Sequence, residues 1–160
     1  MTYTYYASEI DKYAIQVTQA NYPNTIQLGD IKTIDFDDLF YEEKVDMLVG
    51  GSPCQSFSFA GKQLNFDDDR GKLFFEFVRA KEFLRPKYFL LENVRMKKEY
   101  QEVMEKYLGV PAQMLNSADV SAQNRVRLYF FGKLMPNGEY EMIPIPKPTP
   151  LNLKMQDILE

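Results

Sequence analysis

Short apolar segments alternate with longer amphipathic segments along most of this chain. Short apolar runs bounded by turn residues are typical of buried strands, and apolar residues spaced three and four apart are typical of helices that cover a sheet. This alternation favours an α/β fold with a mainly parallel sheet. The expected strands are residues 3–7, 25–28, 45–49, 88–91, 113–115 and 127–132, and the expected helices are residues 9–20, beginning near Ser8, 72–84 and 97–108.

The composition excludes several kinds of site. The chain of 160 residues has no histidine and one cysteine, Cys54. Catalysis by a Ser-His or Cys-His pair and a zinc site of the usual Cys/His type are therefore excluded. A magnesium or calcium site made of carboxylates stays open, but we interpret the acidic run at residues 67–69 as a solvated turn or a helix cap. We find no signal peptide or membrane-spanning run, and the single cysteine points to a reducing compartment.

The charged residues are distributed unevenly, although the net charge is only −4. Residues 1–78 hold 6 basic and 13 acidic side chains, whereas residues 79–133 hold 11 basic and 6 acidic side chains. A basic middle segment could face a polyanion, and an ordinary solvated surface explains the same distribution equally well.

Cys54 follows directly on a predicted strand, in the segment Gly50-Gly51-Ser52-Pro53-Cys54-Gln55-Ser56. Ligands of open α/β sheets bind at the carboxyl ends of the strands, so this position favours a functional thiol, although a buried structural cysteine is the alternative. Three further polar segments follow predicted strands and are expected at the same sheet edge. They are Glu9 with its neighbours, Gly29-Asp30 and Glu92-Asn93.

Several of these segments resemble the signature motifs of the DNA cytosine-5 methyltransferases, in the order of that family. The segments 51–58, 92–94 and 123–127 resemble three of the motifs, and residues 69–74 resemble another. The resemblance covers most of residues 3–133. The ordered set is much more specific than any one motif. It implies a Rossmann-like S-adenosylmethionine-dependent methyltransferase fold.

The resemblance also implies a catalytic set of four residues. Cys54 would add to C6 of a cytosine that is flipped out of double-stranded DNA, and Glu92 in its acid form would protonate N3. Arg125 and Arg127 alternate along an extended segment and so share one face, where they could bind the base O2, contact a phosphate or position Glu92. Residues 55–69 resemble the mobile loop of the family. The structural alternatives are a turn cap for Glu92 and solvated or acid-paired arginines.

The methyl donor implied by the resemblance is S-adenosylmethionine. Glu9 resembles the acid that binds the ribose hydroxyls, Ile10 would pack on the adenine, and Asp30 resembles the acceptor of the adenine amino group. Further candidates for contact with the cofactor are Ile31, Pro53, Leu73 and Asn93, and Asn93 would also help to hold its loop. A helix cap at Glu9 and a turn at Asp30 are the structural alternatives.

The chain departs from the family pattern at both ends. The first family strand with its Phe-x-Gly-x-Gly turn has no counterpart before Tyr3, and neither the target-recognition domain nor the last family motifs follow. We therefore expect an incomplete fold, with a partial catalytic domain at residues 1–135 and a hairpin and proline-rich exit segment at 136–160. The missing strand lies within the family's sheet, so exposed edges predict a complementing chain or a homodimer.

These observations lead to one principal expectation about function. The resemblance is closest to bacterial or phage forms, so it implies a cytoplasmic methyltransferase that acts on cytosine C5 in a truncated or split form. A catalytically inactive module that binds a partner chain or DNA is the alternative, and an unrelated thiol enzyme is a third, weaker one.

Overall fold

The computed structural model of the protein describes residues 3–41, 44–52 and 72–157. The chain forms two compact units, residues 1–42 and 43–160. Cys54, Pro53 and the expected loop at residues 55–69 lie outside the described residues.

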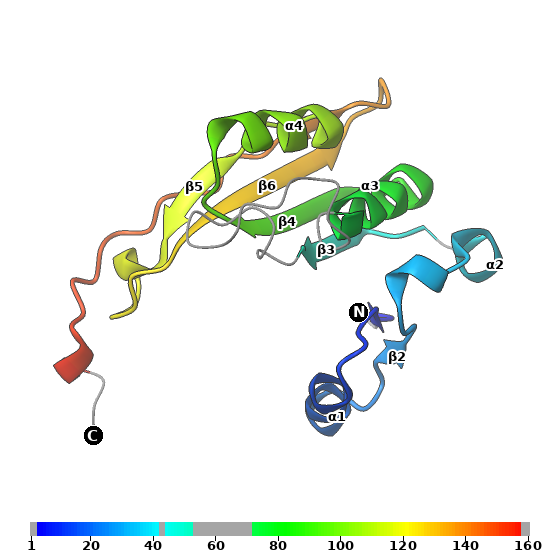
Figure 1. The fold of residues 1–160 in the computed structure, drawn as a ribbon, viewed down its shortest axis with the longest axis horizontal. Helices are drawn as coiled ribbons and strands as arrows, with labels where there is room; N and C mark the ends of the chain where they lie inside the picture. Colours follow the sequence, from blue (N-terminus) through cyan, green and yellow to red (C-terminus); the bar gives the residue numbers. More distant parts are fainter. Residues whose placement is uncertain (1–2, 42–43, 53–71, 158–160) are drawn as a thin grey trace. The chain divides into compact units, whose positions relative to one another are not determined.

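The first unit contains a short parallel strand pair. Strands β1 (Tyr6–Ala7) and β2 (Ile26–Gln27) pair in parallel, and helix α1 (Lys12–Asn21) connects them (Figure 1). Helix α1 begins four residues later than the expected start near Ser8, because Asp11 is its N-cap. The Asp11 Oδ1 atom accepts hydrogen bonds of 2.9 Å from the backbone N–H groups of Tyr13 and Ala14, which fixes the first turn there.

Two short helices follow that the sequence pattern did not predict. The 3₁₀ helix η1 (Ile31–Thr33) and helix α2 (Phe36–Phe40) begin after Asp30 and Asp35, and both aspartates accept hydrogen bonds from backbone N–H groups at the helix starts. Phe36 and Phe40 are buried, and the ring of Phe40 meets the edge of Tyr6 at 4.9 Å between centroids. This aromatic packing gives the first unit a small core of its own.

The second unit is built on a five-stranded sheet. Its strands are β3 (Met47–Gly51), β4 (Tyr88–Val94), β6 (Val126–Leu134) and β5 (Gln113–Asn116), in that order, with β7 (Tyr140–Met142) paired to β6. Only β3 and β4 pair in parallel, whereas β6 is antiparallel to β4, β5 and β7. The expectation of a mainly parallel sheet is therefore wrong for this unit.

The short connections explain the mixed sheet. The link from β5 to β6 runs from residue 117 to residue 125 and includes the 3₁₀ helix η3 (Ser117–Asp119). A parallel crossover needs about a dozen residues or more, so β6 returns antiparallel between β4 and β5. The predicted hairpin turn at residues 136–138 then reverses the chain into β7, with Gly138 at a φ of 86°.

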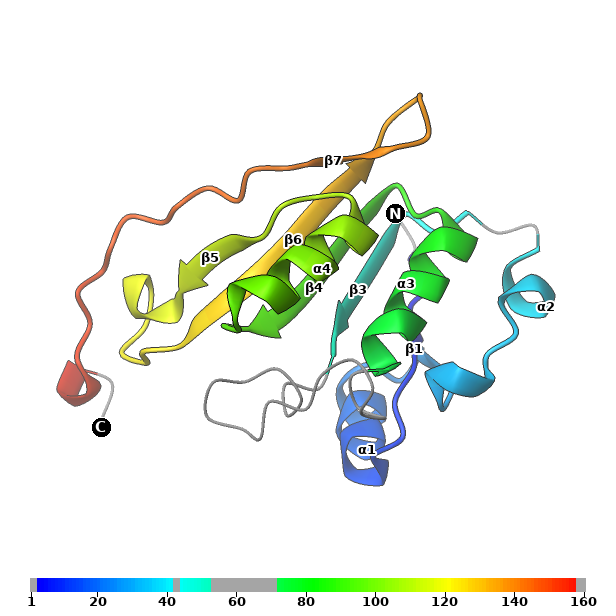
Figure 2. The ribbon, with the colours of Figure 1, turned by 45° about the horizontal axis from the view of Figure 1, so that its top comes forward.

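The helices α3 (Lys72–Leu84) and α4 (Lys98–Leu108) lie on the same face of this sheet (Figure 2). Their bounds match the predicted ones to within one residue. The side chains they bury pack on alternate residues of β4 and β6, which is the expected pattern for a half-covered sheet. The fully buried members of this core include Phe74, Phe89, Leu91, Met104, Leu108 and Phe130.

One buried cation joins the two helices. Lys81 of α3 is 3% exposed, and its Nζ atom donates to the backbone oxygens of Tyr107 and Leu108 at 3.1 and 3.2 Å. These carbonyls at the end of α4 have no acceptor role within the helix, so the lysine satisfies them and fixes α4 against α3. Helix α4 then stops at Gly109, which adopts the left-handed conformation with a φ of 77°.

Strand β4 is longer than predicted. The expected strand ends at residue 91, but the pairing with β6 continues through Val94. Glu92 and Asn93 therefore lie within the strand, near its carboxyl end, rather than after it. Burial alternates along it, with Phe89, Leu91 and Asn93 buried on the helix-covered face. Glu92 therefore lies on the opposite face.

The segment after β7 carries four prolines between residues 144 and 150 and has no regular structure until η4 (Met155–Asp157), a single 3₁₀ turn. Gln113 holds the start of this segment, since its side chain contacts the backbone of Ile143 and Ile145. None of the helices in the described ranges has the length and apolar character needed to cross a membrane.

Candidate active site

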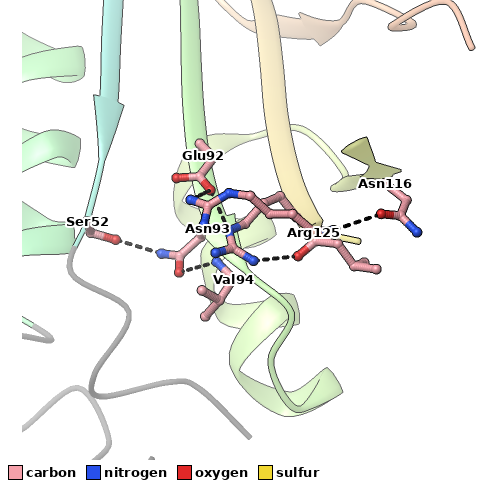
Figure 3. Close-up of polar contacts among 8 residues, drawn as sticks. Ser52, Glu92, Asn93, Val94, Asn116 and Arg125 are labelled. Carbon is pink, nitrogen blue, oxygen red and sulfur yellow. Dashed lines mark hydrogen bonds and ion pairs between the residues drawn. The ribbon is translucent and has the colours of Figure 1, made fainter. Parts of the chain in front are cut away.

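Three of the predicted catalytic residues meet where β4 ends and β6 begins. Glu92 lies on β4, and Arg127 lies on β6 opposite Val94. The Glu92 Oε1 atom is 2.8 Å from Arg127 Nε and 3.8 Å from Arg125 Nη2 (Figure 3). The antiparallel register brings the two arginines, which are 33 positions and more away in the sequence, to one carboxylate.

The Glu92–Arg127 contact is an ion pair without a hydrogen bond. The Arg127 Nε atom is buried and its N–H group has no hydrogen-bond partner among the described residues, although Oε1 lies close to it. The Nη1 atom of the same guanidinium donates to the backbone oxygen of Val126 at 2.8 Å. The Val126 oxygen and the Glu92 carboxylate therefore both hold the Arg127 guanidinium in place.

Asn93 holds the end of β3 beside this pair. Its side chain is 1% exposed, and its Nδ2 atom donates to Ser52 Oγ at 2.7 Å while Oδ1 accepts from the Val94 N–H group at 2.8 Å (Figure 3). Gly51 faces Glu92 in the strand register, and a Cβ atom there would lie 3.4 Å from Glu92 Oε2. Ser52, the last described residue before Pro53 and Cys54, is therefore held at the end of β3, one position after the residue that pairs with Glu92.

The approach to β6 is fixed by Asn116, a residue that the sequence analysis missed. Its Oδ1 atom accepts from the backbone N–H group of Arg125 at 3.0 Å, and its Nδ2 atom donates to Asn124 at 2.9 Å. Oδ1 also accepts from Ala118 at the start of η3. The sequence does contain a pattern that could have identified Asn116. An asparagine that follows a predicted strand and precedes a serine favours a side-chain cap.

The predicted cofactor residues of the first unit follow its two paired strands. Glu9 comes after β1 and Asp30 after β2, and Ser8 Oγ joins the two strand ends by donating to the Gly29 oxygen at 2.7 Å. Glu9 Oε1 accepts from the backbone N–H groups of Ile10 and Asp11, and Asp30 Oδ1 accepts from Lys32. The capping roles left open by the sequence are therefore present.

These caps leave part of each carboxylate available. Within the described residues, the second oxygen of Glu9 and that of Asp30 accept no hydrogen bond. Ile10, the residue after Glu9, is 75% exposed, and Ile31, the residue after Asp30, is partly buried. Two carboxylates with an exposed apolar side chain can accept from hydroxyl or amino donors while an aromatic base packs on the isoleucine, so the residues fit an adenosine group. Leu73, another candidate, is half-buried at the start of α3.

The helix-covered mixed sheet, with polar residues at its strand ends, defines a Rossmann-like methyltransferase fold. Two solved structures share it. A Spodoptera frugiperda DNMT2 mutant superposes with a TM-score of 0.66 at 22% identity, over 97% of this chain and 51% of its own. An Escherichia coli prophage protein assigned as a DNA modification methyltransferase gives a TM-score of 0.64 at 26% identity, over 81% of this chain and 39% of its own.

The sequence comparisons identify the family. The model of the C-5 cytosine-specific DNA methylases matches residues 1–160, so the chain belongs to this family. It is 39% identical to the type II methyltransferase M1.ScrFI of Lactococcus lactis over 97% of this chain and 42% of that protein. It is also 37% identical to the type II methyltransferase M.NlaIV of Neisseria lactamica, over 89% of this chain and 38% of that protein. The orphan methyltransferase M.SPRI of Bacillus phage SPR is 37% identical, over 96% of this chain and 36% of that protein. The chain spans about two fifths of the length of these relatives.

Proposed function

We propose that this chain carries the catalytic centre for methyl transfer to C5 of a cytosine flipped out of double-stranded DNA. The main support is the cluster in which Glu92 pairs with Arg127 and Arg125. The next residue, Asn93, holds Ser52, which precedes the single cysteine by two positions. Family membership adds to this support, and the relatives named above are type II and orphan methyltransferases.

Each residue of the proposed centre has a defined task. C5 of cytosine is a poor nucleophile, so the Cys54 thiolate adds to C6, forming a C–S bond and moving electron density toward C5 and N3. Glu92 delivers a proton to N3, or binds it strongly, as charge accumulates there. Once C5 carries the methyl group, loss of the C5 proton to water lets the C–S bond break, which returns the thiolate, and the N3 proton returns to Glu92.

The arginines bind and orient the base in this proposal. We assign the Arg127 guanidinium, whose Nε atom lies 2.8 Å from Glu92 Oε1, to binding the base O2. Arg125 lies further from Glu92 and its side chain is 48% exposed, so we assign it to Glu92 positioning or to a phosphate. Asn93 uses both ends of its amide within the protein, and we assign it to holding Ser52.

S-adenosylmethionine, the donor proposed for this site, supplies the electrophilic methyl group when bound. Glu9 would accept from the ribose hydroxyls and Asp30 from the adenine amino group, and the exposed Ile10 side chain would lie on the adenine. Ile31, Pro53 and Leu73 remain further proposed contacts.

We also propose that a second polypeptide completes the centre. Among the described strands, β3 pairs only with β4, and its Met47 and Val49 side chains are 47% and 60% exposed. Unpaired apolar strand edges readily take a further strand. A polypeptide that supplies a strand to the β3 edge should therefore raise the transfer rate when it is added, and a rate unaffected by it would contradict this part of the proposal.

Methyl transfer from labelled S-adenosylmethionine to duplex DNA tests the function, with the wild-type chain and Cys54→Ser assayed alone and with the completing polypeptide. The wild type should label cytosine C5, and Cys54→Ser should abolish labelling while duplex binding is largely kept. Duplex binding without labelling by any wild-type preparation would favour the inactive binding module. Equal labelling by Cys54→Ser would exclude the covalent route.

A further inference from the structure

We propose that Arg95, Lys97 and Lys98 form a backbone clamp that binds phosphates of duplex DNA beside the proposed active site. The inference deepens the proposed function and rests on a duplex substrate. The three cations follow β4 directly, three to six positions after Glu92, and the segment 95–98 has no acidic residue.

A buried anchor holds the clamp in place. Met96 is 4% exposed and belongs to the main core cluster, whereas Arg95 and Lys97 on either side of it are exposed. The connection between β4 and α4 is therefore fixed by packing, while the cationic side chains point to solvent. A positioned cation loses less conformational freedom on binding than one on an unanchored loop.

The ion pairs that the lysines make are weak. Lys97 Nζ is 4.0 Å from Glu99 Oε1, and Lys98 Nζ is 3.6 Å from Glu102 Oε1, with all four side chains at least 45% exposed. Exposed pairs of this kind contribute about 0.2–1 kcal/mol. Arg95 makes no ion pair with any described residue. The three cations are thus available to a polyanion at little cost.

Two lysines at the start of α4 are unfavourable for the helix, whereas Glu99 in the same first turn is favourable. Lys97 is the N-cap of α4 without a side-chain cap, and Lys98 is its first residue, where the helix dipole disfavours positive charge. Helices α1 and α2 instead have aspartate caps, Asp11 and Asp35. Residues that destabilise an element and make no compensating contact in the structure are expected at functional sites.

The strand register brings a fourth exposed cation, Arg125, to the same end of the sheet. Val94 lies opposite Arg127, so the chain that leaves β4 at Arg95 and the chain that enters β6 from Arg125 are at the same end of the sheet. Duplex phosphates suit this arrangement because several exposed cations in a row bind a repeating anion without reading its sequence. The clamp would orient the duplex so that a flipped base reaches Glu92.

The salt dependence of DNA binding tests the clamp. Affinity for a fluorescent duplex oligonucleotide is measured between low and physiological salt for the wild type and for Arg95→Gln, Lys97→Gln and Lys98→Gln together. Each phosphate contact contributes about 0.9 to the slope of log affinity against log salt. The triple variant should lower the slope by about two to three and weaken binding by about tenfold or more.

Matched variants separate a clamp from general electrostatics. Lys106→Gln removes an exposed cation from the last turn of the same helix and should leave the slope nearly unchanged. Cys54→Ser should keep the wild-type slope, so failure of methyl transfer can be told apart from failure of the clamp. An unchanged salt slope in a triple variant of wild-type thermal stability would overturn the proposal. So would a change in slope for Lys106→Gln as large as one third of that for the triple variant. Absence of duplex binding by the wild type would overturn it as well.

Discussion

Arg127 and Arg125 reach the same carboxylate but are held differently. Arg127 is 20% exposed, lies 2.8 Å from Glu92 and is fixed by the backbone oxygen of Val126, whereas Arg125 is 48% exposed and 3.8 Å away. A buried, short contact is worth more than an exposed, long one because solvent screens it less. The two arginines should therefore differ in their effect on catalysis.

Replacing each arginine by lysine tests this difference. Lysine keeps the charge but loses the planar set of donors. Arg127→Lys should slow single-turnover methyl transfer by about ten- to hundredfold, the effect of losing one hydrogen bond to a charged group. Arg125→Lys should slow it by less. An effect of Arg125→Lys equal to or larger than that of Arg127→Lys would contradict the assigned roles.

Tyr140 is a second residue whose burial has a measurable consequence. Burial raises the pKa of its phenol from 10.0 to about 12, with the Arg85 charge opposing and the Glu82 charge adding to this shift. Its O–H group donates to the Pro86 oxygen at 2.9 Å. The folded state therefore holds this proton more tightly than the unfolded state, so the stabilisation is fully present below pH 10 and is lost as the pH rises toward 12.

Alkaline unfolding of the wild type and of Tyr140→Phe measures this contribution. The free energy of unfolding of the wild type should fall by about 2–3 kcal/mol more than that of the variant between pH 9 and pH 12, at 1.36 kcal/mol per pKa unit. Parallel pH profiles for the two proteins would show that Tyr140 does not titrate in the way its burial implies.

At the residue scale the sequence located the acid and the two arginines but not the contacts that hold them. Glu92, Arg125 and Arg127 were placed by motif, and the ion pairs confirm that they meet. The Asn93–Ser52 bond and the role of Asn116 depend on strand register between segments far apart in the sequence. Local patterns carry no information on that register.

At the element scale, glycines decide how closely α3 approaches the sheet. A Cβ atom at Gly50 would lie 2.6 Å from the Phe77 ring of α3, whereas one at the adjacent Gly51 would meet nothing closer than 3.4 Å. The first distance is too short for packed carbon atoms, so α3 or Phe77 would have to move.

Alanine at the two neighbouring glycines gives a matched comparison. Gly50→Ala should lower the free energy of unfolding by about 1–3 kcal/mol, the usual cost of overpacking a core. Gly51→Ala should change it by less than about 1 kcal/mol. Denaturant unfolding of both variants measures the difference. Equal losses in the free energy of unfolding would contradict the close contact between Phe77 of α3 and Gly50.

The elements themselves were predicted with uneven success, for physical reasons. Helices α3 and α4 have long amphipathic patterns with clear stops at residues 86 and 109, and their bounds were predicted to within one residue. Helix α2 is only Phe36–Phe40, too short for a periodic pattern to show. The direction of β6 was missed because apolar alternation is the same in parallel and antiparallel strands that are buried on one face.

At the scale of the whole molecule, the residues proposed for the cofactor and those proposed for the base belong to different units. The carboxylates assigned to S-adenosylmethionine, Glu9 and Asp30, belong to the first unit, and the acid–arginine cluster belongs to the second. Binding of the cofactor and reaction at the base are therefore separable by mutation. The sequence predicted both sets through family motifs, and strand pairing confirms that Glu9 and Asp30 follow one parallel pair.

Cofactor binding tests the first unit separately. In calorimetric titrations with S-adenosylhomocysteine, Glu9→Gln should weaken binding by about tenfold or more, since a charged acceptor of ribose hydroxyls becomes a neutral amide. Asp37→Asn, at an exposed carboxylate in the first turn of α2, should bind as the wild type does. Equal affinities for Glu9→Gln and the wild type would remove Glu9 from the cofactor site.

Trapping the covalent intermediate tests the central proposal most directly. The chain, with its completing polypeptide where one is needed, is incubated with S-adenosylmethionine and a duplex that contains 5-fluorocytosine, and the products are weighed by intact and peptide mass spectrometry. We predict a species with the combined mass of chain and DNA, linked at Cys54 and absent from Cys54→Ser. Methyl transfer to ordinary DNA without this species, or a link at any other residue, would contradict the proposal.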